Sequence, residues 1–296
     1  MSDDCNEAVT SFCASCGVAE NEEVKLKNCN GCYLVKYCGI QCQKAHRKQH
    51  KRACKIRAAE LRDELLFKQP ESSHLGDCPI CSLPMPLDLT KSGVRSCCSK
   101  VICNGCTFAE AKQIMEMRLQ HTCPFCREST NRTDEEDERR RMKRIEANDP
   151  VALRREGDLQ QKKGNCASAF GYFTKAAKLR DAQAHYRLAG MYHNGEGVEM
   201  EKGKYTYHLE EAAIGGHPHA RYHLGKYEWE HGSHERAVKH WIIAATQGDD
   251  DATKALMISF RQGYVSKEQL DATLRVHKAA VDATKSPHRE EVENYY

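Results

Sequence analysis

Cysteine is the residue type whose number and spacing could support chemistry in this chain. The 296-residue sequence contains 17 cysteines, of which 15 lie between Cys13 and Cys126. Five CxxC pairs occur in that stretch, and such pairs can place two thiolates on one metal ion. The first residues, MSDDCNEAVT, are acidic and polar and predict no signal peptide, so the thiols are expected to stay reduced. The pattern therefore predicts structural zinc sites rather than disulfides.

The first cysteine cluster offers eight candidate ligands, enough for two tetrahedral zinc ions with four ligands each. The eight are Cys13, Cys16, Cys29, Cys32, Cys38, Cys42, His50 and Cys54. His46 is an alternative to His50. However, His50 precedes Cys54 by four residues, which puts both side chains on one face of a helix, so His50 is preferred.

Residues 13–54 resemble the MYND zinc finger, because all eight ligand positions occur in the order typical of that family. The resemblance implies interleaved ligand pairs. Cys13, Cys16, Cys38 and Cys42 would hold one ion, and Cys29, Cys32, His50 and Cys54 the other. It also implies a protein-interaction module that grips short proline-rich peptides. Arg47 stands where the family usually has an aromatic residue, so the flat apolar wall for a proline ring is missing here.

The basic run from Arg47 to Arg52 follows in the same finger. It could contact phosphates, but no aromatic residues interleave with it to provide a stacking platform for bases. A solvated helix face is therefore expected.

A second cysteine cluster supplies eight more candidate ligands. They are Cys78, Cys81, Cys97, Cys98, Cys103, Cys106, Cys123 and Cys126. The two clusters together hold fifteen cysteines and His50, and four zinc ions need sixteen ligands. This count favours both Cys97 and Cys98 as ligands. The alternative uses one of them together with His121.

The order and gaps of the second cluster resemble a RING finger, a cross-braced fold that binds two zinc ions. By analogy, one ion would be held by Cys78, Cys81, Cys103 and Cys106, and the other by Cys97, Cys98, Cys123 and Cys126. The third and fourth ligands of that family are usually a Cys and a His separated by one residue. Here Lys100 occupies the His position, and a protonated amine cannot bind zinc.

The RING resemblance also implies a docking surface for a ubiquitin-conjugating enzyme. The family uses an apolar residue inside the first CxxC pair, a proline after the seventh ligand and a cation after the eighth; these are Ile80, Pro124 and Arg127 here. Such a finger acts by positioning the thioester-linked ubiquitin, without covalent chemistry of its own. Where the family presents an aromatic residue from the following helix, this sequence offers Ile114, Met115 and Leu119. A ligase module and a purely structural module therefore remain alternatives.

The C-terminal half of the chain carries a helical repeat. The pairs Ala176-Ala177, Ala212-Ala213 and Ala244-Ala245 recur at intervals of 36 and 32 residues. The stretch from Ala184 to Gly216 resembles Sel-one-like repeats of the tetratricopeptide superfamily. Each helix-turn-helix unit buries its apolar face only by stacking on the next unit, so an all-α solenoid is expected. Ser266-x-x-Gln269 is a capping-box sequence and predicts a final amphipathic helix that caps the solenoid.

Eleven of the fifteen histidines follow residue 150. They lack Cys or carboxylate partners at ligand spacing, so packing and surface roles are expected rather than a third metal cluster. Tyr and His side chains of the repeats are also candidates to line a concave peptide-binding surface. The sequence contains no catalytic triad, phosphate-cradling glycine loop or dinucleotide fingerprint.

The expected fold is modular: two small zinc-stabilised fingers followed by an all-α helix-turn-helix solenoid. The expected divisions are a MYND-like finger at 13–54, a helical linker at 55–76, a RING-like finger at 77–128, a charged linker at 129–148, and a solenoid with its capping helix at 149–285. The charged linker is expected to be a solvated, partly helical connector, because an acidic block precedes a basic one from Thr133 to Arg141.

The expected function is a zinc-binding protein-interaction adaptor, with a RING-type ubiquitin ligase as the leading interpretation. The alternative is a non-enzymatic scaffold, for example in a transcription complex. The expected partners are a client peptide and, for a ligase, a ubiquitin-conjugating enzyme. The net charge of +3 argues against a dedicated nucleic-acid surface, and the longest apolar run, Trp241–Ala245, is too short to span a membrane. A cytoplasmic or nuclear location is expected.

Overall fold

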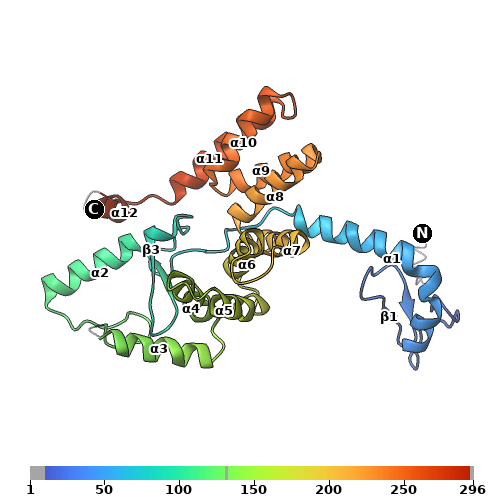
Figure 1. Cartoon of the computed structure of the whole chain (residues 1–296), viewed down its shortest axis with the longest axis horizontal. Coiled ribbons are helices and arrows are strands. Elements are labelled where there is room, and N and C mark those ends of the chain that lie inside the picture. The colour runs from blue at the N-terminus through green and yellow to red at the C-terminus, as the bar shows by residue number, and fades with distance from the viewer. Residues whose placement is uncertain (1–10, 131–132, 294–296) are drawn as a thin grey trace, which may run out of the picture. The chain divides into compact units, whose positions relative to one another are not determined.

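The computed structural model describes residues 11–130 and 133–293 (Figure 1). The chain divides into two units, Met1–Lys68 and Gln69–Tyr296. The first unit contains a two-stranded antiparallel sheet, β1 (Lys27–Asn28) and β2 (Lys36–Tyr37), and the long helix α1 (Ile40–Leu66). The expected helical linker after residue 54 is therefore not a separate element, because its helical part is the second half of α1.

The second unit begins with a cysteine-rich module of residues 69–130. Its elements are a 3-10 turn η1 (Leu89–Lys91), the hairpin of β3 (Ser92–Val94) and β4 (Val101–Cys103), and helix α2 (Asn104–Met117). Buried Met85 and Ile102 form its apolar core together with the cysteines. A core this small cannot offset the entropy of ordering the chain, so the module depends on metal or on packing against the rest of the unit.

Ten helices follow in the described part of the second unit. They are α3 (Asp134–Glu146), α4 (Pro150–Lys162), α5 (Cys166–Lys178), α6 (Ala182–Asn194), α7 (Lys202–Ile214), α8 (Pro218–Glu230), α9 (His234–Thr246), α10 (Asp250–Arg261), α11 (Lys267–Ala283) and α12 (Pro287–Glu293). Helices α4 and α5, α6 and α7, and α8 and α9 pack as pairs, and each pair stacks on the next. The all-α solenoid predicted from the alanine repeat is confirmed.

The repeat has a physical cause at both ends of each helix pair. Asp149, Asp181, His217 and Asp249 stand at the N-caps of α4, α6, α8 and α10, where their side chains accept backbone N–H groups. The alanines three residues after these caps are fully or almost fully buried, and so are the alanine pairs that end α5, α7 and α9. Small side chains at these positions let adjacent helices approach closely.

One glycine shows how tight this approach is. A Cβ atom on Gly225 of α8 would overlap the indole ring of Trp241 in α9. The indole Nε1 of Trp241 donates a hydrogen bond to the carbonyl oxygen of Tyr222, at 3.1 Å. Glycine is therefore required there to admit the largest side chain of that core.

The charged linker is helical, as the expectation of a partly helical connector has it, but one side of this helix packs on α4 and is not solvated. Helix α3 begins with a capping box between Thr133 and Glu136. Its Arg141 forms a 2.7 Å ion pair with Glu156 of α4, and the two side chains are only 14% and 7% exposed. The acidic block therefore lies at the N-terminus of α3, where negative charge is stabilising. Arg141 of the basic block that follows contacts α4.

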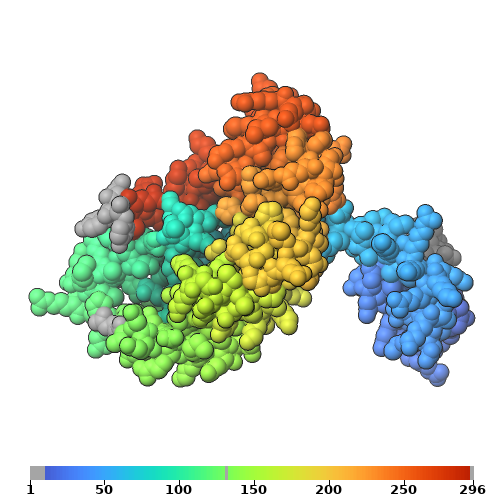
Figure 2. Space-filling model, viewed as in Figure 1, coloured from blue at the N-terminus to red at the C-terminus, as the bar shows by residue number. Residues whose placement is uncertain are grey.

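The C-terminal elements are partly as expected. The capping box between Ser266 and Gln269 starts α11, which packs on α9 and α10, so that prediction is confirmed. The chain then adds α12, beyond the expected end at residue 285. Figures 1 and 2 show α12 beside α2 of the cysteine-rich module, and the two helices are in contact. Among the described residues, no helix has the length and apolar character needed to cross a membrane.

Candidate functional site

The first cluster forms where a bend of the chain meets the start of α1. The sulfur atoms of Cys13, Cys16, Cys38 and Cys42 lie within 4.8 Å of one another. The Cys16–Cys38 and Cys38–Cys42 sulfur distances are 3.6 and 3.5 Å. Thiolates bound 2.3 Å from one tetrahedral ion would lie about 3.8 Å apart, so the spacing suits a single zinc ion.

The second cluster in the first unit joins a CxxC pair to the side of α1. Its members are Cys29, Cys32, His50 and Cys54. The imidazole Nε2 of His50 is 3.2 Å from the sulfur of Cys32. His46, the alternative ligand, lies outside this group, because its Nδ1 is hydrogen-bonded to the hydroxyl of Tyr37 at 3.1 Å. Its ring stacks on that of His50 and so helps to orient it.

The third cluster joins the first CxxC pair of the cysteine-rich module to the junction between β4 and α2. It consists of Cys78, Cys81, Cys103 and Cys106. The sulfur distances are 3.8 Å between Cys78 and Cys106 and 3.9 Å between Cys81 and Cys103. Cys103 ends β4 and caps α2, so the strand-to-helix junction fixes the second pair of sulfurs.

The fourth cluster contains the adjacent cysteines. Cys97 and Cys98 meet Cys123 and Cys126, and the sulfurs of Cys98 and Cys123 are 3.8 Å apart. The turn that carries Cys97 and Cys98 closes with Ser99 in the left-handed region (φ 58°), where its N–H donates to the carbonyl oxygen of Arg95. His121 lies outside the cluster and is exposed. The structure thus brings together the sixteen predicted ligands in the four predicted groups.

The electrostatics of the clusters favour a divalent cation. Burial raises the pKa of the Cys78 thiol, but backbone N–H donors of Cys103, Cys81 and Ile80 outweigh burial and lower the pKa to about 6. The pKa of Cys13 is lowered to about 6 against burial mainly by backbone N–H donors, and that of Cys29 is lowered to about 6 by the N–H of Gly31 and by hydrogen bonds from neighbouring ligand side chains. In contrast, burial and the neighbouring cysteines raise the pKa of Cys106. One thiol per cluster ionises readily while a second resists, so four thiolates together need a metal charge to hold them.

The three predicted docking residues are all exposed. Ile80 is 44% exposed although it lies between two ligands of the third cluster, so the metal-binding loop rather than a core holds it in place. Pro124 and Arg127 are exposed in the loop of the fourth cluster. Helix α2 adds the exposed apolar side chains of Met115 and Met117.

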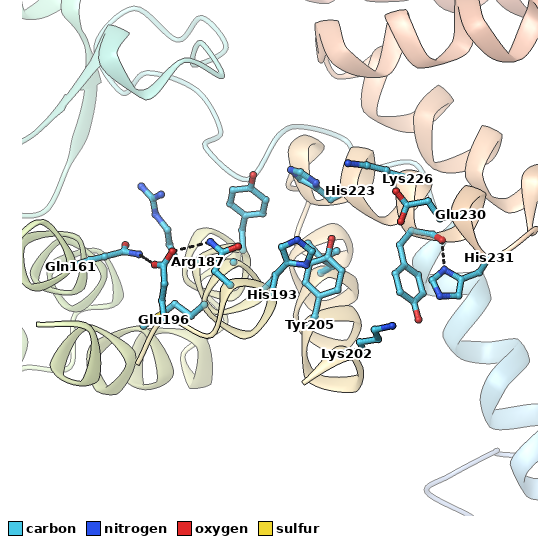
Figure 3. A pocket seen from close by; sticks show the side chains of 17 residues that line it. Gln161, Arg187, His193, Glu196, Lys202, Tyr205, His223, Lys226, Glu230 and His231 are labelled. Carbon is cyan, nitrogen blue, oxygen red and sulfur yellow. Dashed lines mark hydrogen bonds between the residues drawn. The ribbon is translucent and has the colours of Figure 1, made fainter. Parts of the chain in front are cut away.

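A groove of about 490 Å³ lies on the solenoid, over α6, α7 and α8 (Figure 3). Aromatic rings form its walls: the centroid of Tyr205 is 4.9 Å from that of His193 and 6.1 Å from that of Tyr227. Burial raises the pKa of Tyr205 to about 12, so its hydroxyl stays a hydrogen-bond donor. Lys202 and Lys226 also line the groove. The sequence predicted a Tyr- and His-lined concave surface, but the spacing alone did not single out these residues.

The polar side chains of this groove are partly fixed by neighbours. Gln161 donates to Glu196 at 2.8 Å, and Arg187 pairs with Asp158 at 3.0 Å. The imidazole of His231 bonds to the carbonyl oxygen of Tyr227 at 2.7 Å. Such an arrangement of flat rings with polar tips and fixed charges can hold an extended peptide, because rings supply contact area and the tips hydrogen-bond its main chain.

Comparison with known proteins finds one family model and several solved structures that are similar to parts of this chain. A family model of the MYND finger matches residues 13–54. Two solved structures are similar at 23% identity: c5321, a protective antigen of uropathogenic Escherichia coli strains that displays an SLR fold, and a Sel1 repeat protein from Oxalobacter formigenes. The matches cover 48% and 58% of this chain and 32% and 52% of those chains, with TM-scores of 0.42 and 0.45. No curated protein matches the sequence.

These observations define a class of protein. The chain combines a MYND finger at residues 13–54 with an all-α solenoid, and its cysteine and histidine clusters fit zinc. Solenoids use extended concave surfaces for binding, and MYND fingers are protein-interaction modules. At this level, the chain has the architecture of a modular adaptor, with a MYND finger and an all-α solenoid that are both kinds of module used to bind other proteins.

Proposed function

We propose that this protein is a RING-type ubiquitin ligase that works as an adaptor in the cytoplasm or nucleus. In this proposal, four zinc ions fill the four clusters, two in the MYND finger and two in the cysteine-rich module of residues 69–130. The solenoid groove and the MYND finger bind the client protein. The cysteine-rich module binds a ubiquitin-conjugating enzyme.

The observation that carries the proposal is the cross-braced order of the third and fourth clusters. The first and third cysteine pairs along the module share one cluster, and the second pair, Cys97-Cys98, shares the other with the fourth. This interleaving places the loops of Ile80 and Pro124 at two separate metal clusters that one hairpin and α2 connect. Each loop is rigid because thiolates at both of its ends would bind one ion, so each can present an apolar side chain to a partner.

The chemistry of transfer needs no covalent step by this chain. An amine of a client lysine attacks the thioester carbonyl of the conjugating enzyme. An isopeptide bond forms, the carbon–sulfur bond breaks, and the enzyme's cysteine is released as a thiol. The ligase contributes proximity and restricts the thioester to a reactive arrangement. Arg127, which directly follows the last ligand, supplies a cation for hydrogen bonds to both the enzyme and ubiquitin.

The groove supports a client-binding role for the solenoid. The polar groups that line the groove are spread along three helices, and in this respect the groove differs from a small-molecule pocket. Lys202 and Lys226 add positive charge at two places along this length. An extended peptide segment of the client can contact groups on all three helices at once.

The test is an autoubiquitination assay with the purified, zinc-loaded full chain and a panel of conjugating enzymes. Ile80→Ala should abolish transfer at unchanged zinc content, because it removes the apolar anchor but no ligand. Ile258→Ala is the matched control, since Ile258 is also an exposed isoleucine but lies on α10. Arg127→Ala should leave enzyme binding intact and slow the discharge of its ubiquitin. A Cys81→Ser variant should lose both metal and activity.

The alternative function is a non-enzymatic scaffold, and α2 favours it. The exposed apolar positions of this helix are methionines, whereas its aromatic residue, Phe108, is partly buried. Wild-type protein that is inactive with every conjugating enzyme would establish the scaffold function instead. Activity that survives Ile80→Ala would show that the enzyme docks elsewhere.

A further inference from the structure

Helix α1 carries a continuous cationic face that the metal clusters do not use. We define this cationic face by six exposed side chains, those of Lys44, Arg47, Lys48, Lys51, Arg52 and Lys55. At about 100° per residue, the six fall within an arc of about 140°, and no other residue between 44 and 55 falls within it. Of the ligands nearby on the helix, His50 lies well away from the centre of this arc, and Cys54 lies just outside its edge.

The six cations of this face form no ion pairs within the part of the chain that the structure describes. Within residues 11–130 and 133–293, none of the six cations has a carboxylate within salt-bridge distance, whereas Arg57 in the next turn pairs with both Glu60 and Glu64. The first 20 residues of α1, 40–59, contain seven Lys or Arg residues and no Asp or Glu. A negatively charged partner would therefore relieve the repulsion between neighbouring cations.

The distribution of charge changes the meaning of the small net charge of the chain. Residues 69–296 contain 33 Lys or Arg and 33 Asp or Glu, whereas residues 1–68 contain 12 and 9. The whole net charge of +3 therefore belongs to the first unit, and α1 concentrates it on one face. The argument from net charge against a polyanion-binding surface does not hold for this unit.

The side chains of the cationic face indicate which kind of negatively charged partner it binds. Protein interfaces place aromatic or apolar anchors at their centre and charges at the rim, but this face has cations only. Proteins that bind single strands need aromatic platforms for the bases, and none lies between Lys44 and Lys55. Contacts made by Lys and Arg alone are typical of binding to phosphates, which fixes position without reading sequence.

The dimensions also suit a double helix. The face is about 16 Å long, and along the axis its six cations are separated by alternating steps of about 4.5 Å and about 1.5 Å. A duplex presents about one phosphate charge per 1.7 Å of its axis, so this length meets more phosphates than it has cations. We propose that the cationic face of α1 binds the phosphate backbone of double-stranded nucleic acid without sequence preference.

The experiment measures binding of the zinc-loaded full chain to a 20-base-pair duplex of random sequence by fluorescence anisotropy. If about five cations each displace a counterion, affinity should fall about 500-fold between 50 and 200 mM salt. In Lys48→Glu/Lys51→Glu, the affinity at 50 mM salt should fall at least tenfold, and the slope of log affinity against log salt should shrink by about two. Zinc content should not change, because both side chains are exposed and bind no metal.

The matched control is Lys25→Glu/Lys27→Glu. It changes the net charge of the same unit equally, at two exposed lysines that precede α1. Its affinity should stay within about threefold of wild type. Equal losses in the two double variants would overturn the proposal, because net charge alone would then explain binding. Undetectable duplex binding at 50 mM salt would also overturn it, as would equally tight binding of a polyglutamate peptide of the same charge or of anionic lipid vesicles.

Discussion

At the scale of single residues, metal clusters depend on the backbone that aims the thiols. Adjacent cysteines normally point in different directions, but the turn closed by Ser99 brings Cys97 and Cys98 to one cluster. Backbone N–H donors then stabilise one thiolate in the same cluster, because the pKa of Cys123 falls to about 7 although burial raises it. The main chain therefore prepares each cluster for a cation before the ligands bind it.

The count of ligands gives a residue-scale prediction. The wild-type chain should bind four zinc ions, and His121→Ala should still bind four because His121 lies outside the fourth cluster. Cys97→Ser should bind three ions tightly, since a hydroxyl is a poor substitute for a thiolate ligand. Metal analysis after dialysis against a weak chelator measures this. Loss of an ion in His121→Ala, or four tight ions in Cys97→Ser, would assign the ligand to the histidine.

The pairs of ligands were predictable because their spacing is a local property of the sequence, whereas their grouping into four clusters was what the resemblance to the two finger families implied. The preference for His50 over His46 followed from the four-residue interval to Cys54 alone. The reason that His46 is held away, its hydrogen bond to Tyr37, joins residues that the spacing rules treat separately. Zinc occupancy of the clusters stays a prediction, and the metal analysis above tests it.

At the scale of elements, α12 fastens the cysteine-rich module to the solenoid. Arg289 of α12 is only 7% exposed. Its guanidinium donates to the carbonyl oxygen of Pro84 at 2.7 Å and to the sulfur of Cys81 at 3.4 Å. Gly105 makes room for it, since a Cβ atom there would lie 2.8 Å from Arg289. A single side chain thus connects the C-terminal helix to a metal ligand.

Arg289→Ala should therefore weaken the third cluster without touching a ligand. Loss of several hydrogen bonds from a buried guanidinium should cost about 2–4 kcal/mol of stability. The measurement is the rate of zinc release to a chromogenic chelator, which should rise in Arg289→Ala. Lys285→Ala is the control, because Lys285 forms an exposed ion pair with Asp282, and such pairs contribute little. Unchanged release from Arg289→Ala would show that α12 does not support the cluster.

Local signals predicted some elements and missed others for a physical reason. The capping box of α11 and the buried alanines of the repeat are set by neighbours in sequence. The packing of α3 depends on Arg141 and Glu156, and the position of α12 depends on Arg289 and Pro84, which lie 205 residues apart. A pairing across such a separation leaves no periodic trace in the sequence. A charged stretch that forms long-range ion pairs therefore has the same pattern as a solvated one.

At the scale of the whole molecule, the second unit is held together by contacts between its cysteine-rich module and the solenoid. Arg155 of α4 donates to the carbonyl oxygen of Val94 in β3, at 3.2 Å. The N–H of His74 donates to the carbonyl oxygen of Gly216 at 2.9 Å, and its ring stacks on that of His217. The segment that precedes the third cluster is thus anchored on the solenoid through histidines.

These histidines make the solenoid sensitive to acid. Burial lowers the pKa of His74 to about 4, and burial and neighbouring cations hold that of His217 well below its usual value. Both imidazoles donate to the same oxygen of Gln183, at 3.0 and 2.8 Å, and Nδ1 of His217 caps α8. A protonated His217 would lose this capping acceptor. The neutral form of each ring is therefore the one that the fold requires.

The sign of the pH dependence follows from linkage. Between about pH 6.5 and pH 4, the unfolded chain binds protons at these histidines and the folded chain does not, so stability falls as the solution is acidified. Each histidine should remove about 1 kcal/mol between pH 7 and pH 5.5. Urea unfolding in excess zinc measures this through the fluorescence of Trp229 in α8 and Trp241 in α9.

His217→Asn should lose about 1 kcal/mol less stability than wild type between pH 7 and pH 5.5, because asparagine also caps helices but does not titrate. His231→Asn, at an exposed position, should follow wild type. Equal losses in His217→Asn and wild type, or constant stability from pH 7 to pH 5.5, would contradict the assignment of the acid sensitivity to these buried rings.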